Sequence, residues 1–310
     1  MNINMNIKMK SKMKSKMKKL IAIASVVLVV LIFTLALSAC GGSGNPGFDK
    51  SKNVSVTARE DGSGTKSAFM EIIGLKGKAD PANVIIQNST AGILTETRSN
   101  PTAIAYESLG YVTDDVKMLS VDGVEASISN IKSGAYKISR PLSVVYKESS
   151  MDKDVNKAFH TFLQSSNAQK IISDEGYVST VDNAPDYTIN GSLSGVISIS
   201  GSTSLKPLMD ELAKEFTDLQ PNITLNVGGG GSGQGYGDAE DNVTDFGMIS
   251  EEFAQEKAPG CVSYIVCKDG IAVIVHKDNP LDNVTIEQLK NIYDVDAGSN
   301  SITKWDALIK

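Results

Sequence analysis

A polar loop at residues 59–65, reading Arg-Glu-Asp-Gly-Ser-Gly-Thr, constrains the fold of this chain most. The β-type run containing Val54 and Val56 precedes it, and residues 68–73 follow with apolar side chains on one helical face. This pattern predicts a strand, a loop and a helix that begins near Ser63. The free N–H groups and positive dipole end of a helix N-terminus attract anions, and Arg59 adds a bidentate donor. A glycine turn with an N-cap and a surface ion pair is the alternative.

A second group of loops carries the same chemistry. Residues 201–204, Gly-Ser-Thr-Ser, lie between a predicted strand at 196–200 and a helix that starts near Leu205. The strand predicted at 223–227 leads into the glycine-rich run 228–235, and residues 245–251 add Ser250 and Glu251. Glycines let backbone N–H groups approach a small ligand closely.

The glycine-rich run differs from the nucleotide-binding motifs. It lacks the Gly-Lys-Ser/Thr ending of a P-loop and matches a dinucleotide fingerprint only loosely. A flexible loop without a binding role is a further alternative. Three loops rich in hydroxyls and glycines, together with one arginine, favour a small tetrahedral oxyanion over a nucleotide.

The N-terminal region predicts export. Residues 1–19 carry seven lysines and no acid, and an apolar run from Leu20 to Ala39 follows. Residues 37–40, Leu-Ser-Ala-Cys, resemble a lipobox, which implies that 1–39 is a signal peptide and that Cys40 is lipidated. Residues 40–51 are expected to form a flexible tether. An uncleaved membrane anchor is the alternative, and both place the rest of the chain outside the cytoplasmic membrane.

Charge limits the possible partners. The formal net charge is −6, and leaving out the seven positive charges of residues 1–39 gives −13 for residues 40–310. This negative charge on residues 40–310 disfavours nucleic-acid binding, which needs a basic surface. No metal-ligand spacing is visible, and no cofactor is expected. Cys261 and Cys267 flank a predicted strand that would hold them too far apart for a disulfide, so free buried thiols are expected. A disulfide formed through a turn is the alternative.

Strand and helix patterns alternate along the rest of the chain. Strands are predicted near 84–86, 116–119 and 141–146, a helix over 88–97, and one long helix over 153–173. Residues 180–195 are turn-rich and are expected to form a linker or surface loop. The pattern predicts an α/β fold with largely parallel sheets, and the length predicts two domains.

The motifs together resemble the PstS family, the phosphate-binding lipoproteins of phosphate ABC transporters, which have the class II periplasmic-binding-protein fold. Residues 201–204, 229–233, 245–248 and 269–275 are similar to motifs of the family's first half. Residues 59–65, 105–111 and 138–142 are similar to motifs of its second half. The resemblance covers nearly all of residues 52–310.

The order of the two halves is reversed here, which resembles a circular permutation joined at residues 180–195. A gene fusion and a truncated tandem array are the alternatives. The resemblance implies two lobes with the ligand in the cleft between them. One lobe would be continuous, residues 141–275, and the other would be split between 52–140 and 276–310.

The resemblance implies that phosphate binds in the cleft and passes to ABC permease subunits. The matching positions are Arg59, Ser63, Gly64, Thr65, Thr203, Ser204, Ser232 and Ser250, with Asp61, Gly231, Gly233 and Glu251 in supporting roles. Asp61 is expected to hold Arg59. Ser250 stands where some members have an aspartate that accepts the phosphate proton, so Glu251 is the candidate acceptor.

Other functions stay open. A phosphatase is conceivable, but no metal cluster or activated nucleophile is visible in the sequence. A sensor or cell-wall interaction module with the same fold is a second possibility. Sulfate or molybdate would need only small changes to the site. We expect a monomer, anchored through a lipid on Cys40 to the outer face of the membrane.

Overall fold

The computed structural model describes residues 47–309, and residues 48–309 belong to one compact unit. The predicted signal peptide and Cys40 lie outside the described residues. Within residues 47–309, no helix has the length and hydrophobicity needed to cross a membrane.

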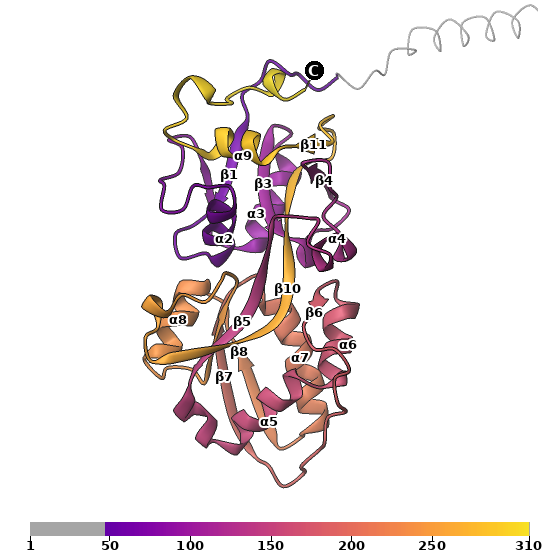
Figure 1. The fold of residues 1–310 in the computed structure, drawn as a ribbon, viewed down its shortest axis with the longest axis vertical. Coiled ribbons are helices and arrows are strands. Elements are labelled where there is room, and N and C mark those ends of the chain that lie inside the picture. Colours follow the sequence, from indigo (N-terminus) through magenta and orange to yellow (C-terminus); the bar gives the residue numbers. More distant parts are fainter. Residues whose placement is uncertain (1–46, 310) are drawn as a thin grey trace, which may run out of the picture. The chain divides into compact units, whose positions relative to one another are not determined.

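One continuous sheet runs through the molecule (Figure 1). Its main path is β2-β1-β3-β10-β5-β9-β7-β8. β2-β1-β3 and β9-β7-β8 are parallel, whereas β10 is antiparallel to both β3 and β5, and β5 is antiparallel to β9. The strands are β1 (Ser55–Arg59), β2 (Ile85–Gln87), β3 (Ala103–Ser108), β4 (Val116–Val121), β5 (Ser139–Lys147), β6 (Val178–Ser179), β7 (Gly195–Gly201), β8 (Ile223–Val227), β9 (Phe246–Ile249), β10 (Cys261–His276) and β11 (Asn283–Val284).

Helices pack around the two ends of this sheet (Figure 1). The upper half of the fold holds α2 (Gly64–Ile72), α3 (Thr90–Ser99), α4 (Ile128–Lys132) and α9 (Ile286–Tyr293). The lower half holds α5 (Asp154–Leu163), α6 (Ser166–Asp174), α7 (Lys206–Leu219) and α8 (Ser232–Glu240). β5 and β10 run from one half into the other.

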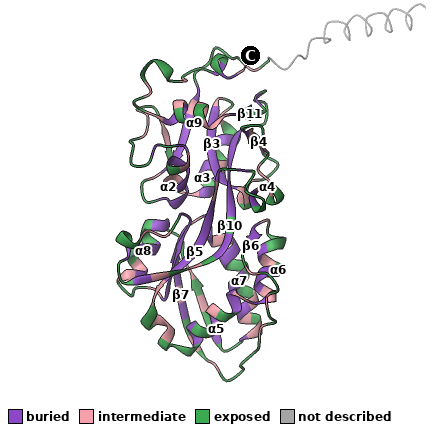
Figure 2. Ribbon diagram, in the orientation of Figure 1, coloured by how far each residue is buried: buried purple, intermediate pink, exposed green. Residues whose placement is uncertain are grey.

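Each half has its own large hydrophobic core (Figure 2). The upper core joins residues from both ends of the described chain, because Val56 and Phe69 share it with Tyr293 and Trp305. The lower core draws only on residues between Leu142 and Cys267. The predicted lobe boundaries at 140 and 275 fall within the crossing strands β5 and β10, and the division at those residues stays a prediction.

The structure confirms the α/β class and corrects three details. The sheet is mixed rather than largely parallel, because β5 and β10 pair antiparallel with each other and with the strands on either side of them. The helix predicted over 153–173 is two helices. α5 ends before Gln164, and Ser165 caps the start of α6, where its hydroxyl accepts a hydrogen bond from the Ala168 N–H. Residues 48–51 are not free tether, because the Phe48 ring packs edge-on against Trp305 at 5.5 Å.

The chain ends of the described part meet in the upper half. Asn53 and Lys304 form an antiparallel bridge, and the Lys50 Nζ donates to the Ile309 carbonyl at 3.3 Å. Cys261 and Cys267 are free and buried, as the sequence predicted.

Candidate functional site

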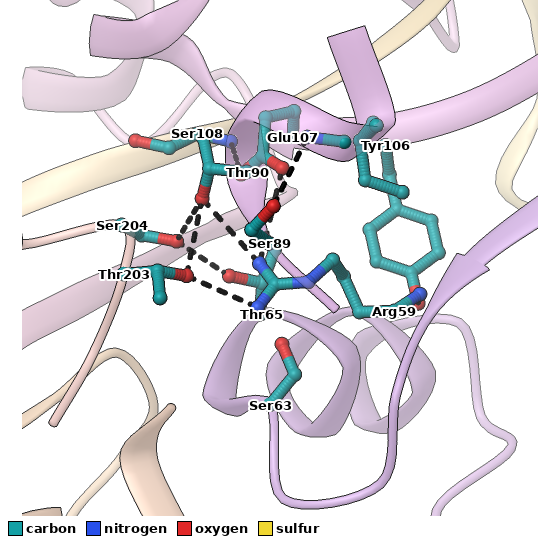
Figure 3. Close-up of polar contacts among 12 residues, drawn as sticks. Arg59, Ser63, Thr65, Ser89, Thr90, Tyr106, Glu107, Ser108, Thr203 and Ser204 are labelled. Atoms are coloured by element: carbon teal, nitrogen blue, oxygen red, sulfur yellow. Dashed lines mark hydrogen bonds and ion pairs between the residues drawn. The ribbon is translucent and has the colours of Figure 1, made fainter. Parts of the chain in front are cut away.

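Residues at four helix N-termini, two from each half of the fold, contribute to one polar cluster. Figure 3 shows Arg59 of this cluster with Thr65, Thr90, Thr203 and Ser204. The upper half contributes α2 with Thr65 and α3 with Thr90. The lower half contributes Thr203 and Ser204 just before α7, and Ser232 at the start of α8. Serine and threonine are favoured at helix starts because their hydroxyls pair with free N–H groups, and this local preference concentrates hydroxyls here.

Arg59, the last residue of β1, is the cation of the cluster and is 1% exposed. Its Nε and one terminal nitrogen donate to the two carboxylate oxygens of Glu60, both at 2.9 Å. The same terminal nitrogen donates to Thr203 Oγ1 at 3.0 Å, and the other donates to Thr90 Oγ1 at 3.4 Å. Arg59 therefore joins the upper and lower halves directly.

The hydroxyls complete this link (Figure 3). Thr65 Oγ1 lies 2.8 Å from Ser204 Oγ, a hydrogen bond between residues 139 positions apart. Thr90 Oγ1 lies 3.3 Å from Thr203 Oγ1 and 3.5 Å from Ser204 Oγ. Each of these oxygens can donate or accept a hydrogen bond, which suits the several oxygens of a small oxyanion.

The glycine loops let the two halves approach closely. The Gly233 N–H donates to the Gly62 carbonyl at 2.9 Å, across the boundary between the halves. A methyl group on Gly64 would lie only 2.3 Å from Ser232 Oγ and 2.8 Å from Ser250 Oγ. Ser232 Oγ in turn accepts from the Ser250 N–H at 3.0 Å. The halves fit together only because position 64 has no side chain.

A second carboxyl group, that of Glu107 at the end of β3, faces Arg59 from a buried position. Its side chain is 0% exposed, and its Oε2 lies 3.9 Å from an Arg59 terminal nitrogen. Burial raises the pKa of the Glu107 carboxyl, and the neighbouring Arg59 only partly offsets this. Glu107 Oε1 accepts from the Ser108 N–H at 2.8 Å, while Oε2 has no hydrogen-bond partner among the described residues.

One supporting role expected from the sequence is wrong. Asp61 does not hold Arg59: its side chain is 99% exposed and pairs with Lys66 Nζ at 2.7 Å. The chain turns outward at Gly62, with a φ of 87°, so Glu60 and not Asp61 lies beside the guanidinium. The role of Glu251 as proton acceptor stays a prediction. Its carboxylate pairs with Lys257 Nζ at 2.8 Å, and Glu251 lines a surface cavity together with Asp61 and Ser63.

The remaining predicted residues lie at or next to the cluster. Ser63 is the N-cap of α2, where its Oγ accepts from the Lys66 N–H at 3.4 Å. Gly231 precedes α8 with a φ of 91°, and its N–H donates to the Gly201 carbonyl at 2.9 Å. Ser250 Oγ lies 3.2 Å from Ser232 Oγ.

Sequence reasoning missed Glu60, Thr90 and Glu107. Thr90 follows the strand β2 and the polar residues Asn88 and Ser89 at the start of a helix. The same strand–loop–helix pattern identified the other binding loops, so the sequence did contain a signal for Thr90. Glu107 is the one acid in the otherwise apolar run 103–107, which is unusual for a strand that is buried along its whole length. Glu60 is next to Arg59, and only the turn geometry distinguishes it from Asp61.

A buried ion pair lies where the crossing strands pass the site. Arg140 of β5 and Asp269 of β10 are register partners, 3.1 Å apart, and both side chains are 1% exposed. Arg140 also donates to the Ser250 carbonyl at 2.9 Å. This pair therefore connects the crossing strands to the loop that carries Ser250.

Within residues 47–309, no group of acidic, histidine or cysteine side chains is arranged to hold a metal ion. The cluster offers one arginine, several hydroxyls and helix N-termini, which together can bind an oxyanion.

Comparison with known proteins assigns the family. Residues 45–167 and 185–309 match the model of a PBP superfamily domain. Phosphate-binding protein PstS 2 of Streptococcus pneumoniae is 33% identical over 280 residues, covering 88% of this chain and 94% of the relative. The chain belongs to the PstS family.

Two further comparisons describe its relation to other members. A crystal structure of a phosphate-binding protein of a phosphate ABC transporter from Streptococcus pneumoniae superimposes on this PstS-family chain with a TM-score of 0.66 and 33% identity. It covers 83% of this chain and 99% of the other. Phosphate-binding protein PstS of Bacillus subtilis is 32% identical over 147 residues, only 46% of this chain and 47% of the relative.

Proposed function

We propose that this protein captures inorganic phosphate outside the cytoplasmic membrane and delivers it to an ABC permease. The observation that carries this proposal is the link from Arg59 to hydroxyls of the opposite half, Thr203 at 3.0 Å among them. A ligand that replaces these contacts would bind both halves at once. The names of the PstS relatives support phosphate as that ligand.

The chemistry of the cluster suits phosphate in particular. Arg59 provides a bidentate cation, and the helix N-termini provide N–H donors and positive dipole ends. The carboxylate of Glu60 beside Arg59 and the hydroxyl oxygens can accept a hydrogen bond from a protonated oxyanion. Sulfate lacks that proton at neutral pH, so a carboxylate acceptor would repel it. Sulfate and molybdate remain the alternative ligands, and a phosphate sensor without transport is the alternative role.

Release requires the two halves to separate, and β5 and β10 are the strands about which we expect them to move. The contacts that would break are hydrogen bonds between side chains and between loops, such as Thr65–Ser204 and Gly233–Gly62. The hydrophobic cores lie within the halves, so they would stay intact. This arrangement serves binding and release, and we infer no catalytic role.

We further infer that the order of the halves is permuted relative to part of the family. A match that follows chain order stops where the order changes, which would account for the half-length match to the Bacillus subtilis relative. The PstS 2 relative matches over 94% of its length and would share the order of this chain. The lipid anchor on Cys40, the permease partner and the monomeric state are parts of the same proposal.

Calorimetry on the ligand-free protein tests the proposal, with phosphate compared against sulfate in the wild type and in Arg59→Ala. We expect tight phosphate binding, little sulfate binding, and loss of phosphate binding in the variant. A folded wild-type protein that produces no heat with phosphate would refute phosphate capture. Hydrolysis of a chromogenic phosphate ester would instead indicate an enzyme.

A further inference from the structure

Glu107 is the one residue of the site to which the proposed phosphate binding by Arg59 and the hydroxyls gives no role. A carboxyl group with 0% exposure and one oxygen without a hydrogen-bond partner among the described residues is costly, because burial strips water from a charge. Arg59 is too far away to satisfy that oxygen, at 3.9 Å, and gives its short hydrogen bonds to Glu60. An unpaired oxygen at this position suggests a role in the ligand-bound state.

The charge balance around Arg59 indicates what that role is. Two carboxylates face a single guanidinium, so the three groups sum to −1 when both carboxylates are ionised. An oxyanion entering this cluster adds at least one more negative charge in a buried environment, where charge repulsion is weakly screened. A proton on Glu107 brings the sum of the three groups to zero, which lowers the electrostatic cost of admitting the anion.

We propose that Glu107 takes up a proton when the oxyanion binds, so that this protein captures phosphate and a proton together. Glu107 acts through Arg59 as a positioning residue, and its protonated Oε2 becomes a hydrogen-bond donor. This inference rests on the proposed function and specifies the charge state in which the site binds its ligand.

The charged groups around Glu107 favour proton uptake by its carboxylate when an anion binds. The charged groups that act on it are Arg59 at the end of β1, Arg140 of β5 and Asp269 of β10. Arg140 and Asp269 pair with each other at 3.1 Å, so their effects on Glu107 oppose one another. The first turn of α3, which supplies Thr90, contains no acidic residue. Arg59 is therefore the group that favours the ionised form most, and an arriving anion offsets Arg59.

A purely structural role for Glu107 is the rival explanation. In that case Glu107 keeps Arg59 in position as a permanent carboxylate, and its charge stays the same when the anion binds. The Glu107→Gln variant separates the two explanations, because glutamine keeps the shape of the side chain and cannot change its charge.

The experiment measures proton uptake during phosphate binding. Calorimetric titrations with phosphate are run between pH 6 and pH 9 in two buffers that differ in ionisation enthalpy, for the wild type and for Glu107→Gln. Asp61→Asn is the charge-matched control, since it removes a carboxylate that is 99% exposed and pairs with Lys66. The ionisation of phosphate itself is common to all three proteins and cancels in the comparison.

We expect the wild type to take up about one proton more per phosphate than Glu107→Gln wherever Glu107 is ionised in the free protein. The Kd of the wild type divided by that of Glu107→Gln should then rise about tenfold per pH unit, because binding that takes up one more proton weakens tenfold for each tenfold fall in proton concentration. Asp61→Asn should take up the same number of protons as the wild type. Infrared difference spectra of the wild type and of Asp61→Asn should gain the C=O stretch of a protonated carboxyl upon phosphate addition, and those of Glu107→Gln should not.

Three results would count against the inference. Equal proton uptake by the wild type and a folded Glu107→Gln variant would overturn it and leave phosphate capture standing. Loss of phosphate binding in folded Glu107→Gln would show that the site needs a carboxylate, which also overturns it. A wild-type protein that does not bind phosphate would refute the proposed function and this inference with it.

Discussion

Replacing Gly64 by alanine should weaken phosphate binding by keeping the two halves of the fold apart. Gly64 is the first residue of α2 in the upper half. A methyl group there would meet Ser232 Oγ at 2.3 Å and Ser232 Cβ at 2.9 Å, both in the lower half. Real Cβ atoms do not approach other atoms so closely, so either the side chain of Ser232 or a whole half must move. Ser232 is 1% exposed and its Oγ bonds the Ser250 N–H, so it cannot move aside freely.

The cost can be worked from this geometry. Inserting one extra methyl group into a packed contact costs about 1–3 kcal/mol. If the strain arises only when the halves close, that cost appears in binding, where about 1.4 kcal/mol corresponds to a tenfold change in Kd. The Kd for phosphate should therefore rise roughly 5- to 150-fold. The free protein can relieve the contact by opening, so its melting temperature should fall by much less than that cost implies.

Calorimetry with phosphate and thermal unfolding without ligand measure the two quantities. Gly237→Ala is the matched control, because Gly237 lies within α8 and a methyl group there has nothing within 4 Å. That variant should keep the wild-type Kd and gain up to about 1 kcal/mol of stability from helix propensity. A Gly64→Ala protein with wild-type affinity would refute the close fit of the halves in the ligand-bound state.

Three further predictions concern buried ionisable groups. Arg140→Ala leaves Asp269 without its partner, so urea unfolding should show a loss of about 3–5 kcal/mol, and a loss below 1 kcal/mol would contradict the buried pair. Because burial raises the pKa of Glu107, the native state holds a proton that the unfolded state releases as pH rises above about 4.3. Glu107→Gln should therefore match the wild-type melting temperature at low pH and exceed it increasingly as pH rises; a constant difference would contradict this. Burial raises the pKa of Cys261 to about 11 and raises that of Cys267 well above its ordinary value, so mass spectrometry should find both thiols unalkylated by iodoacetamide at pH 8 until the protein is unfolded.

The sequence predicted well the features that depend on neighbouring residues. Helix starts near Ser63 and Ser89 follow from N-cap chemistry, and the structure has Ser63 Oγ and Ser89 Oγ accepting backbone N–H groups of α2 and α3. Strand β8 begins and ends where β-branched and apolar residues predicted it. The binding-loop motifs were also readable, and they led to the PstS family.

Tertiary structure alone decided which side chains meet. Thr65 and Ser204 are 139 residues apart, and their contact depends on how the two halves pack. Whether Glu60 or Asp61 holds Arg59 depends on the backbone turn at Gly62, which composition does not specify. The break between α5 and α6 is local instead, because the Ser165 hydroxyl caps the start of α6.

The sequence by itself therefore determined the local elements, the family and the chemistry available: hydroxyls, glycines and one arginine at helix starts. These follow from interactions between residues close in the chain. The tertiary structure decided the charge environment of Arg59, because the position of Glu107 depends on the pairing of β3 with β10, strands more than 150 residues apart in sequence. Burial by that packing turns an ordinary glutamate into the proposed proton-coupled group.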